Sequence, residues 1–225
     1  MPTKASRSTS RAAHNTDQPM HEADKRLLDR MLFFSDAVFA IVLTIMVLDL
    51  RPPPGASESG DAAVWTMLAG LVRPFFAFIV SFALVGMWWS VHMRITRRMI
   101  RFDWLTAAFN FAFLLTVALV PFASSVLGEY GGTGAAWEIY WGVNAASSLT
   151  LTSIGLASSR GGGRLIGGTT RAERIIYFIR NSSPGLCFAA GIWLAANGHV
   201  VQSRYCWVLI PPIMVIMGWI QRRYR

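Results

Sequence analysis

Six long apolar stretches constrain this chain more than any other feature of its sequence. They cover residues 30–50, 64–93, 103–127, 135–157, 175–196 and 205–220. A helix needs about 20 mainly apolar residues to cross the hydrocarbon core of a bilayer, and each stretch meets or approaches that length. A segment surrounded by lipid must also satisfy its backbone hydrogen bonds internally, which favours the helix. We therefore predict an all-α, polytopic membrane protein with six transmembrane helices.

The composition agrees with a membrane location. Of the 225 residues, 53% are hydrophobic and only 15% are charged, a balance that is too apolar for an ordinary soluble domain. A formal net charge of +9 could indicate nucleic-acid binding, but the basic residues cluster beside the apolar stretches instead of forming one patch. We expect the lipid bilayer as a partner, and no nucleic acid.

The lysines and arginines predict the topology. Seventeen of them lie in the N-terminal segment, the second and fourth loops and the C-terminus, whereas the first, third and fifth loops hold only Arg51 and Arg204. Short cytoplasmic loops carry the excess of positive charge in membrane proteins. Both termini are therefore predicted to be cytoplasmic. Residues 1–25 are predicted to form a disordered cytoplasmic tail, and residues 26–225 a single six-helix transmembrane domain.

The first apolar stretch carries a serine and an aspartate, Ser35 and Asp36, near its beginning. A charged side chain at the centre of a membrane helix costs roughly 2.5–3.5 kcal/mol on insertion scales, so such residues usually face a partner inside the protein. A helical wheel places an apolar stripe nearly opposite this pair. The stripe consists of Ile41, Thr44, Ile45 and Leu48. By spacing alone, such a stripe faces lipid or another helix.

Polar residues of the second and third predicted helices reach the same depth as this pair. We predict that a polar cluster ties the first three helices together, comprising Arg30, Ser35, Asp36, Trp89, His92, Asp103 and Asn110. Interhelical hydrogen bonds contribute about 1–2 kcal/mol each and fix the register of membrane helices. The alternative is a proton relay through Asp36 and His92. A single cluster on one side of the membrane is too short for a complete pathway, so the structural role is preferred.

The residues Arg30, Phe34, Ser35 and Asp36 spell RxxxFSD. Here the sequence resembles a potassium-channel family of lysosomes and prokaryotes whose signature is FSD at the start of the first helix. Other features that resemble this family are SF at 81–82, WSVH at 89–92, Asp103, Asn110 and PF at 121–122. Ala37 departs from the glycine that is frequent after FSD.

The resemblance implies a six-helix unit that assembles as a homotetramer in a prokaryotic plasma membrane, with the first helices lining a central pore for passive K⁺ flux. The family builds its constriction from aliphatic side chains of the first helix, which match Ile41, Ile45 and Leu48, with Thr44 at a nearby hydroxyl layer. The family's interhelical network matches Ser35, Asp36, Trp89, His92 and Asn110. The family lacks TVGYG, the carbonyl filter of other potassium channels, and this sequence does not contain that string either.

Asp49 lies at the edge of the stripe and is a weaker candidate for a residue that concentrates cations at the outer mouth. A solvated residue at a helix end is the alternative interpretation. No metal other than permeating K⁺ and no cofactor is expected.

Two features leave other functions open. The segment RNSSPG at 180–185 and the pair Pro211–Pro212 interrupt the fifth and sixth stretches, which suits a secondary transporter with broken helices. Proline in membrane helices is more often a kink, which we prefer. A proton-permeable channel is a further alternative. Because HExxH, GxSxG and Walker patterns are all absent from the sequence, we predict that the protein is not an enzyme.

Overall fold

A computed structural model of the protein describes residues 18–51, 60–101, 103–163, 165–166, 170–210, 212 and 215–216. In this part the chain is helical apart from short connections, so the predicted all-α fold is confirmed. The 3₁₀-helices are denoted η. In chain order, the elements are α2 (Gln18–Ile45), η1 (Met46–Asp49), α3 (Asp61–Gly70), α4 (Val72–Thr96), α5 (Trp104–Ala118), α6 (Val120–Tyr130), α7 (Gly134–Ser158), α8 (Arg160–Gly163), α9 (Arg171–Ala196), α10 (Val200–Arg204) and η2 (Tyr205–Leu209).

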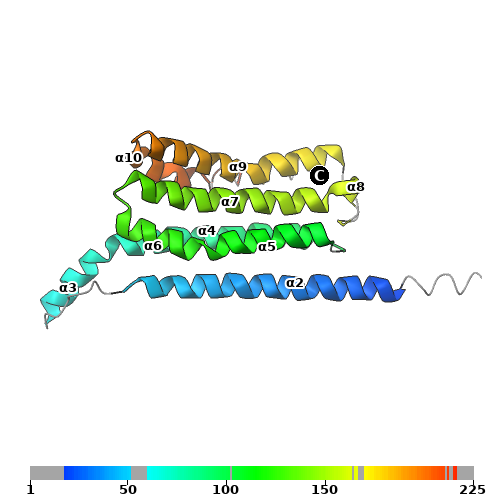
Figure 1. The fold of residues 1–225 in the computed structure, drawn as a ribbon, viewed down its shortest axis with the longest axis horizontal. Helices are drawn as coiled ribbons and strands as arrows, with labels where there is room; N and C mark the ends of the chain where they lie inside the picture. The colour runs from blue at the N-terminus through cyan, green and yellow to red at the C-terminus, as the bar shows by residue number, and fades with distance from the viewer. Residues whose placement is uncertain are drawn as a thin grey trace, which may run out of the picture.

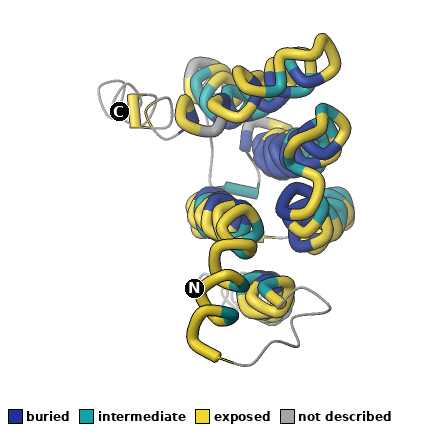
Figure 2. The backbone as a smooth tube through the Cα atoms, turned by 90° about the vertical axis from the view of Figure 1, so that its left-hand side faces the viewer, coloured by how far each residue is buried: buried dark blue, intermediate teal, exposed yellow. Residues whose placement is uncertain are grey.

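The long helices run nearly parallel to one another in a stack (Figure 1). α9 packs on α7, α7 packs on α5 and α6, and α4 packs against α6. α2 lies on the opposite side of the stack from α9 and contacts α4 and α5. In the view along the helices, the buried residues gather on α7 in the middle of the stack, whereas α2 is exposed over much of its circumference (Figure 2).

Among the described residues, three segments are long and apolar enough to cross a membrane: Asp24–Asp49, Val72–Thr96 and Trp104–Tyr130. They correspond to the first three predicted spans. The fourth and fifth predicted spans form α7 and α9, which are less apolar because α7 carries many hydroxyl side chains and α9 begins with charged residues. The sixth predicted span, residues 205–220, begins with η2 and lies largely outside the described residues.

Two predicted spans prove to be pairs of helices. The predicted span 64–93 consists of α3 and α4, which meet at Leu71, and the predicted span 103–127 consists of α5 and α6, which meet at Leu119. In both cases the second helix has a proline in its first turn, Pro74 or Pro121. A proline has no N–H to donate and its ring clashes with the carbonyl four residues earlier, so the preceding helix ends there. The break at Leu71 lets α3 project from the stack (Figure 1).

The first helix begins earlier than predicted. α2 starts at Gln18, so residues 18–25 of the predicted disordered tail are helical. The residues that begin this helix include good helix formers, and Arg26 pairs with Glu22 one turn away at 3.7 Å. Asp24 also lies 3.9 Å from Arg101, which precedes α5. Residues 1–17 of the predicted tail lie outside the described residues.

The fifth helix is not broken at its proline, in line with the preferred interpretation of the RNSSPG segment. α9 runs continuously from Arg171 to Ala196 with Pro184 inside it. The missing N–H of Pro184 would otherwise bond the carbonyl of Arg180, and the hydroxyl of Ser183 donates to that carbonyl instead, at 2.8 Å. The helix therefore passes through the proline because a neighbouring side chain replaces the lost backbone donor.

Candidate functional site

α2 has two faces with opposite environments. Its buried face repeats at helical spacing and consists of Ser35, Phe39, Val42 and Met46. The predicted stripe lies away from these residues and is exposed: Ile41 at 57%, Ile45 at 42%, Leu48 at 58%, and Thr44. Because η1 is a 3₁₀-helix, side chains three residues apart align along it, which keeps Leu48 roughly in line with Ile45.

Three buried side chains connect α2, α4 and α5. The side-chain amide of Asn110 on α5 donates from Nδ2 to Ser35 Oγ on α2 at 3.1 Å. Its Oδ1 lies 2.7 Å from His92 Nε2 on α4. Since an amide oxygen can only accept, Nε2 carries the proton of this hydrogen bond. Ser35 Oγ in turn donates to the carbonyl of Met31 at 2.9 Å. We call Ser35, His92 and Asn110 the buried triad.

Aromatic rings hold the imidazole of His92 in place. Its ring stacks on Phe113 of α5, with centroids 5.5 Å apart and an interplanar angle of 14°. Phe39 of α2 packs against both rings at 5.9 Å. Offset stacked and tilted ring pairs of this kind add packing energy and fix ring orientation. The triad is therefore a polar contact enclosed by apolar side chains.

Asp36 and Trp89 form a separate contact. The indole Nε1 of Trp89 on α4 donates to Asp36 Oδ1 at 2.9 Å. Both side chains are exposed in a single copy of the chain, in contrast to the buried triad. The pair joins α2 to α4 at the surface, one residue along α2 from Ser35.

Two predicted members lie outside this network. Asp103 precedes α5 and caps it, accepting a hydrogen bond from the backbone N–H of Thr106 at 2.8 Å. An aspartate directly before an apolar helical run is favoured at the N-cap, so its side chain folds over the helix end instead of along the helix face. Arg30 is exposed on α2, and the described residues give it no hydrogen bond to the triad or to Asp36.

A second set of polar contacts, which the sequence prediction missed, connects α7 to its neighbours. Tyr140 of α7 hydrogen-bonds Ser81 of α4 at 3.0 Å, and Asn144 accepts from Trp88 of α4 at 3.3 Å. Tyr140 and Asn144 lie one turn apart, and the polar series continues along α7 through residues 147, 148 and 152. This helical spacing of polar residues is the sequence signal from which the contacts of α7 could have been predicted.

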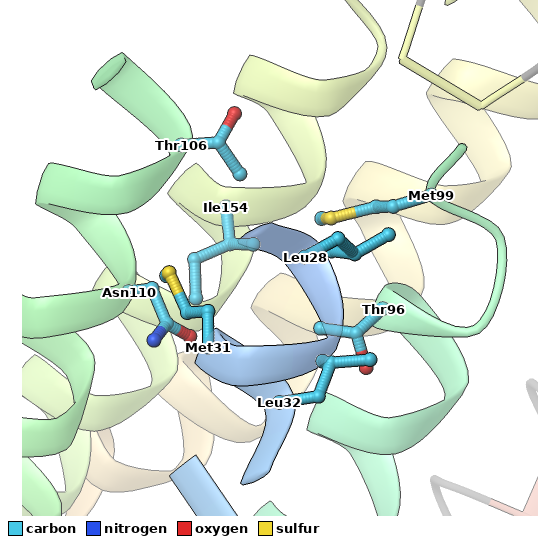
Figure 3. A pocket seen from close by; sticks show the side chains of 8 residues that line it. All are labelled: Leu28, Met31, Leu32, Thr96, Met99, Thr106, Asn110 and Ile154. Carbon is cyan, nitrogen blue, oxygen red and sulfur yellow. The ribbon is translucent and has the colours of Figure 1, made fainter. Parts of the chain in front are cut away.

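A small cavity adjoins Asn110 (Figure 3). Its volume of about 10 Å³ is close to the minimum space for one water. It lies toward the end of the stack at which α4 ends and α5 and α9 begin, which we call the basic end. The lining is mainly apolar and comprises Leu28, Met31, Leu32, Thr96, Met99, Thr106, Asn110 and Ile154. Five apolar side chains therefore share the lining with Thr96, Thr106 and the triad member Asn110.

Asp49 is exposed at the opposite end of the stack. It lines an open cleft between the end of α2, the start of α4 and α6, together with Glu129. Arg51 and Arg73 line the same cleft, so the two carboxylates share it with two guanidinium groups. This mixed charge weakens the expected negative potential around Asp49.

Comparison with known proteins adds an independent observation. Residues 30–121 match the family described as the endosomal/lysosomal potassium channel TMEM175. The matched range includes all three members of the buried triad, the pair Asp36–Trp89 and the exposed stripe of α2.

Individual relatives extend this similarity. A potassium channel of Streptomyces collinus is 29% identical over 182 residues, which make up 75% of this chain and 87% of that protein. A potassium channel of Chamaesiphon minutus is 35% identical over 101 residues, 45% of this chain and 49% of that protein. The human endosomal/lysosomal proton channel TMEM175 is 28% identical over 99 residues, 44% of this chain and 19% of that protein.

The fold is also similar to a solved structure. The crystal structure of a lysosomal potassium-selective channel TMEM175 homolog from Chamaesiphon minutus aligns with a TM-score of 0.72 at 24% identity. The alignment covers 85% of this chain and 98% of that one. The arrangement of helices is therefore shared over nearly the whole length of that protein.

Proposed function

Because the protein belongs to the TMEM175 family, we propose that it is a potassium-conducting channel of a prokaryotic plasma membrane. The family is one of ion channels, so the protein is not an enzyme. The similarity to the Streptomyces potassium channel, along 87% of that protein, is the observation that carries the proposal. The apolar helices of the chain support the membrane location.

In the proposed channel, four copies of the chain surround a central pore lined by α2, with six spans each and cytoplasmic termini. α2 lies at the edge of the single chain and leaves its stripe uncovered, as a pore-lining helix requires. Four copies around one axis would form rings of Ile41, Ile45 and Leu48. Narrow apolar rings gate ion flow by excluding water, and we assign the constriction to them.

Thr44 belongs to the same exposed face, and we assign it to a hydroxyl layer beside the constriction. Its Oγ1 lies 2.9 Å from the carbonyls of both Ala40 and Ile41. The proton of the hydroxyl is thus directed back to the helix, which leaves the oxygen lone pairs for a cation. Asp49 at the outer mouth has a lesser part in the proposal, because Arg51 and Arg73 share its cleft.

We assign a positioning role to the buried triad and to the pair Asp36–Trp89. Asn110 bonds Ser35 on one side and His92 on the other, and so fixes the rotation and depth of α2 relative to α4 and α5. That rotation directs the stripe away from the bundle. The rings of Phe39 and Phe113, which pack against the imidazole of His92, favour this role over a proton relay, which needs a polar path.

The proposal is tested by K⁺ flux in proteoliposomes that contain the wild-type protein or Ile41→Ala. Shortening a ring of four isoleucines widens the constriction, so we expect faster flux and weaker discrimination against Na⁺. Leu149→Ala is the matched control, because Leu149 is an exposed aliphatic residue of α7, outside the stripe. Flux and selectivity that are the same in Ile41→Ala and in Leu149→Ala would contradict the constriction, and no K⁺ flux in the wild type would contradict the channel.

Proton permeation is the second candidate, because the human relative is named a proton channel. A pH-sensitive dye in the same vesicles measures it directly. The transporter alternative loses part of its support, because α9 is continuous through Pro184.

A further inference from the structure

A ridge of basic and aromatic side chains lies on α9 near the basic end. Arg174, Tyr177 and Arg180 follow one another at three-residue spacing, which places them on one side of the helix. Tyr177 packs against Gly155 of α7 so closely that a Cβ at Gly155 would overlap its hydroxyl end. This part of α9, yellow in Figure 1, runs beside the C-terminal half of α7.

A fourth residue reaches the ridge from another helix. Arg94 belongs to the last turn of α4, and its charge acts on both Tyr177 and Arg180. Two guanidinium groups on different helices are therefore close enough to repel each other. Within the described residues, neither Arg94 nor Arg174 forms an ion pair, and the nearby carboxylate of Glu173 accepts from the backbone of Thr170. Arg94 and Arg174 thus bring positive charge to the ridge without an ion pair among the described residues.

Two polar atoms of the ridge are buried without a hydrogen-bond partner among the described residues. They are the hydroxyl oxygen of Tyr177 and Nε of Arg174. Buried polar groups in proteins are nearly always hydrogen-bonded, because an unpaired donor loses its bonds to water without replacement. Both atoms can donate, and the neighbouring guanidinium groups donate as well. The chemistry of this donor set fits an anion with several acceptor oxygens.

We propose that Arg94, Arg174, Tyr177 and Arg180 bind the phosphate headgroup of an anionic phospholipid of the cytoplasmic leaflet. Arg94 lies in the last turn of α4 and Arg174 in the first turn of α9, and Arg94 is exposed, so a headgroup can approach the ridge from the bilayer at Arg94. Basic pockets between membrane helices on the cytoplasmic side bind such headgroups. The proposal takes only the orientation of the helices from the proposed function, and it needs no ion conduction.

Lipid binding is tested on the purified full-length chain in a neutral detergent. The thermal midpoint Tm is followed by tryptophan fluorescence while phosphatidylglycerol, phosphatidylcholine or inorganic phosphate is added. We expect phosphatidylglycerol to raise Tm by several degrees more than phosphatidylcholine does. Arg94→Gln with Arg180→Gln removes two charged donors, which should weaken phosphatidylglycerol binding roughly tenfold or more.

Three further variants make the result specific. Arg97→Gln with Arg98→Gln removes the same charge from exposed positions at the same end of α4, and should keep the wild-type response. Tyr177→Phe keeps the ring against Gly155 and should lose part of the response. Arg94→Gln alone alters an exposed residue and answers the question if the double variant fails to fold.

The proposal is overturned if the control pair loses as much response as the arginine variants, or if phosphatidylglycerol protects no better than phosphatidylcholine. Phosphate alone giving the full protection would overturn the assignment to lipid. Because this experiment measures no flux, a failure here leaves the channel proposal intact, and absent K⁺ flux leaves lipid binding intact.

Discussion

α2 and α7 are both long helices, yet they are attached to the bundle in opposite ways. α7 is buried on most sides, and its Trp141 packs against Phe188 of α9 with ring centroids 5.6 Å apart. α2 contacts the bundle through one narrow face, on which Ser35 carries an interhelical hydrogen bond. α7 is therefore fixed by packing and hydrogen bonds on several sides, whereas α2 is fixed through one face only. A helix held in the second way can present its opposite face to other copies of the chain.

The largest effect is expected in the packed region, from Trp141→Ala. The substitution leaves a cavity beside Phe188 and removes the hydrogen bond to Ser203 of 2.9 Å. Removal of a buried tryptophan side chain costs about 3–5 kcal/mol. We expect a large drop in Tm in detergent. Trp193→Ala is the matched control, because Trp193 is exposed on α9, and an equal drop in both variants would refute the packing argument.

A smaller effect on stability, but a larger one on flux, is expected from Asn110→Ala. The variant leaves Ser35 and His92 buried without their amide partner, at a cost of about 2 kcal/mol. Because α2 can then rotate, K⁺ flux per folded channel should change, whereas Trp141→Ala should mainly lower the amount of folded protein.

Asn197→Ala serves as the control for this variant, since within the described residues the side-chain amide of Asn197 bonds to its own helix, at the carbonyl of Trp193. A double-mutant cycle of His92→Ala and Asn110→Ala should give a coupling free energy clearly different from zero. If the two substitutions were additive, the triad would not act as one unit.

The smallest effect is expected from Trp89→Phe, which removes the indole N–H and keeps an aromatic ring. It loses one hydrogen bond to Asp36 at an exposed position, worth about 1 kcal/mol or less. Tm should fall slightly more than in Trp104→Phe, a control at an exposed tryptophan outside the network. A fall in Tm as large as that of Asn110→Ala would show that the pair Asp36–Trp89 contributes as much to holding α2 in place as the buried triad does.

The same contrast explains which parts of the structure could be predicted from sequence. Hydropathy located the first three spans, and the RxxxFSD residues indicated the family whose model matches residues 30–121. Depth along the helices was sufficient to group Ser35, His92 and Asn110, because residues at one level of parallel helices become neighbours.

Local chemistry limited the rest of the prediction. The role of Asp103 depends on where α5 begins, and an average over an apolar window cannot locate that residue. The breaks at Leu71 and Leu119 depend on the placement of Pro74 and Pro121 within a helical turn, while α9 continues through Pro184 because Ser183 donates to a carbonyl. The contacts of α7 depend on which neighbours surround it, and the pattern of one helix does not name them.

The hydrogen bonds of the buried triad all run in one direction. His92 donates to Asn110, Asn110 donates to Ser35, and Ser35 donates to the carbonyl of Met31. The final acceptor, the carbonyl of Met31, has no proton to pass on. The amide of Asn110 does not readily release one N–H proton and take up another. A proton delivered to the imidazole would have no onward route through these three side chains, although their geometry would still be transmitted. In the proposed channel, these three side chains therefore transmit orientation between helices and do not carry a proton.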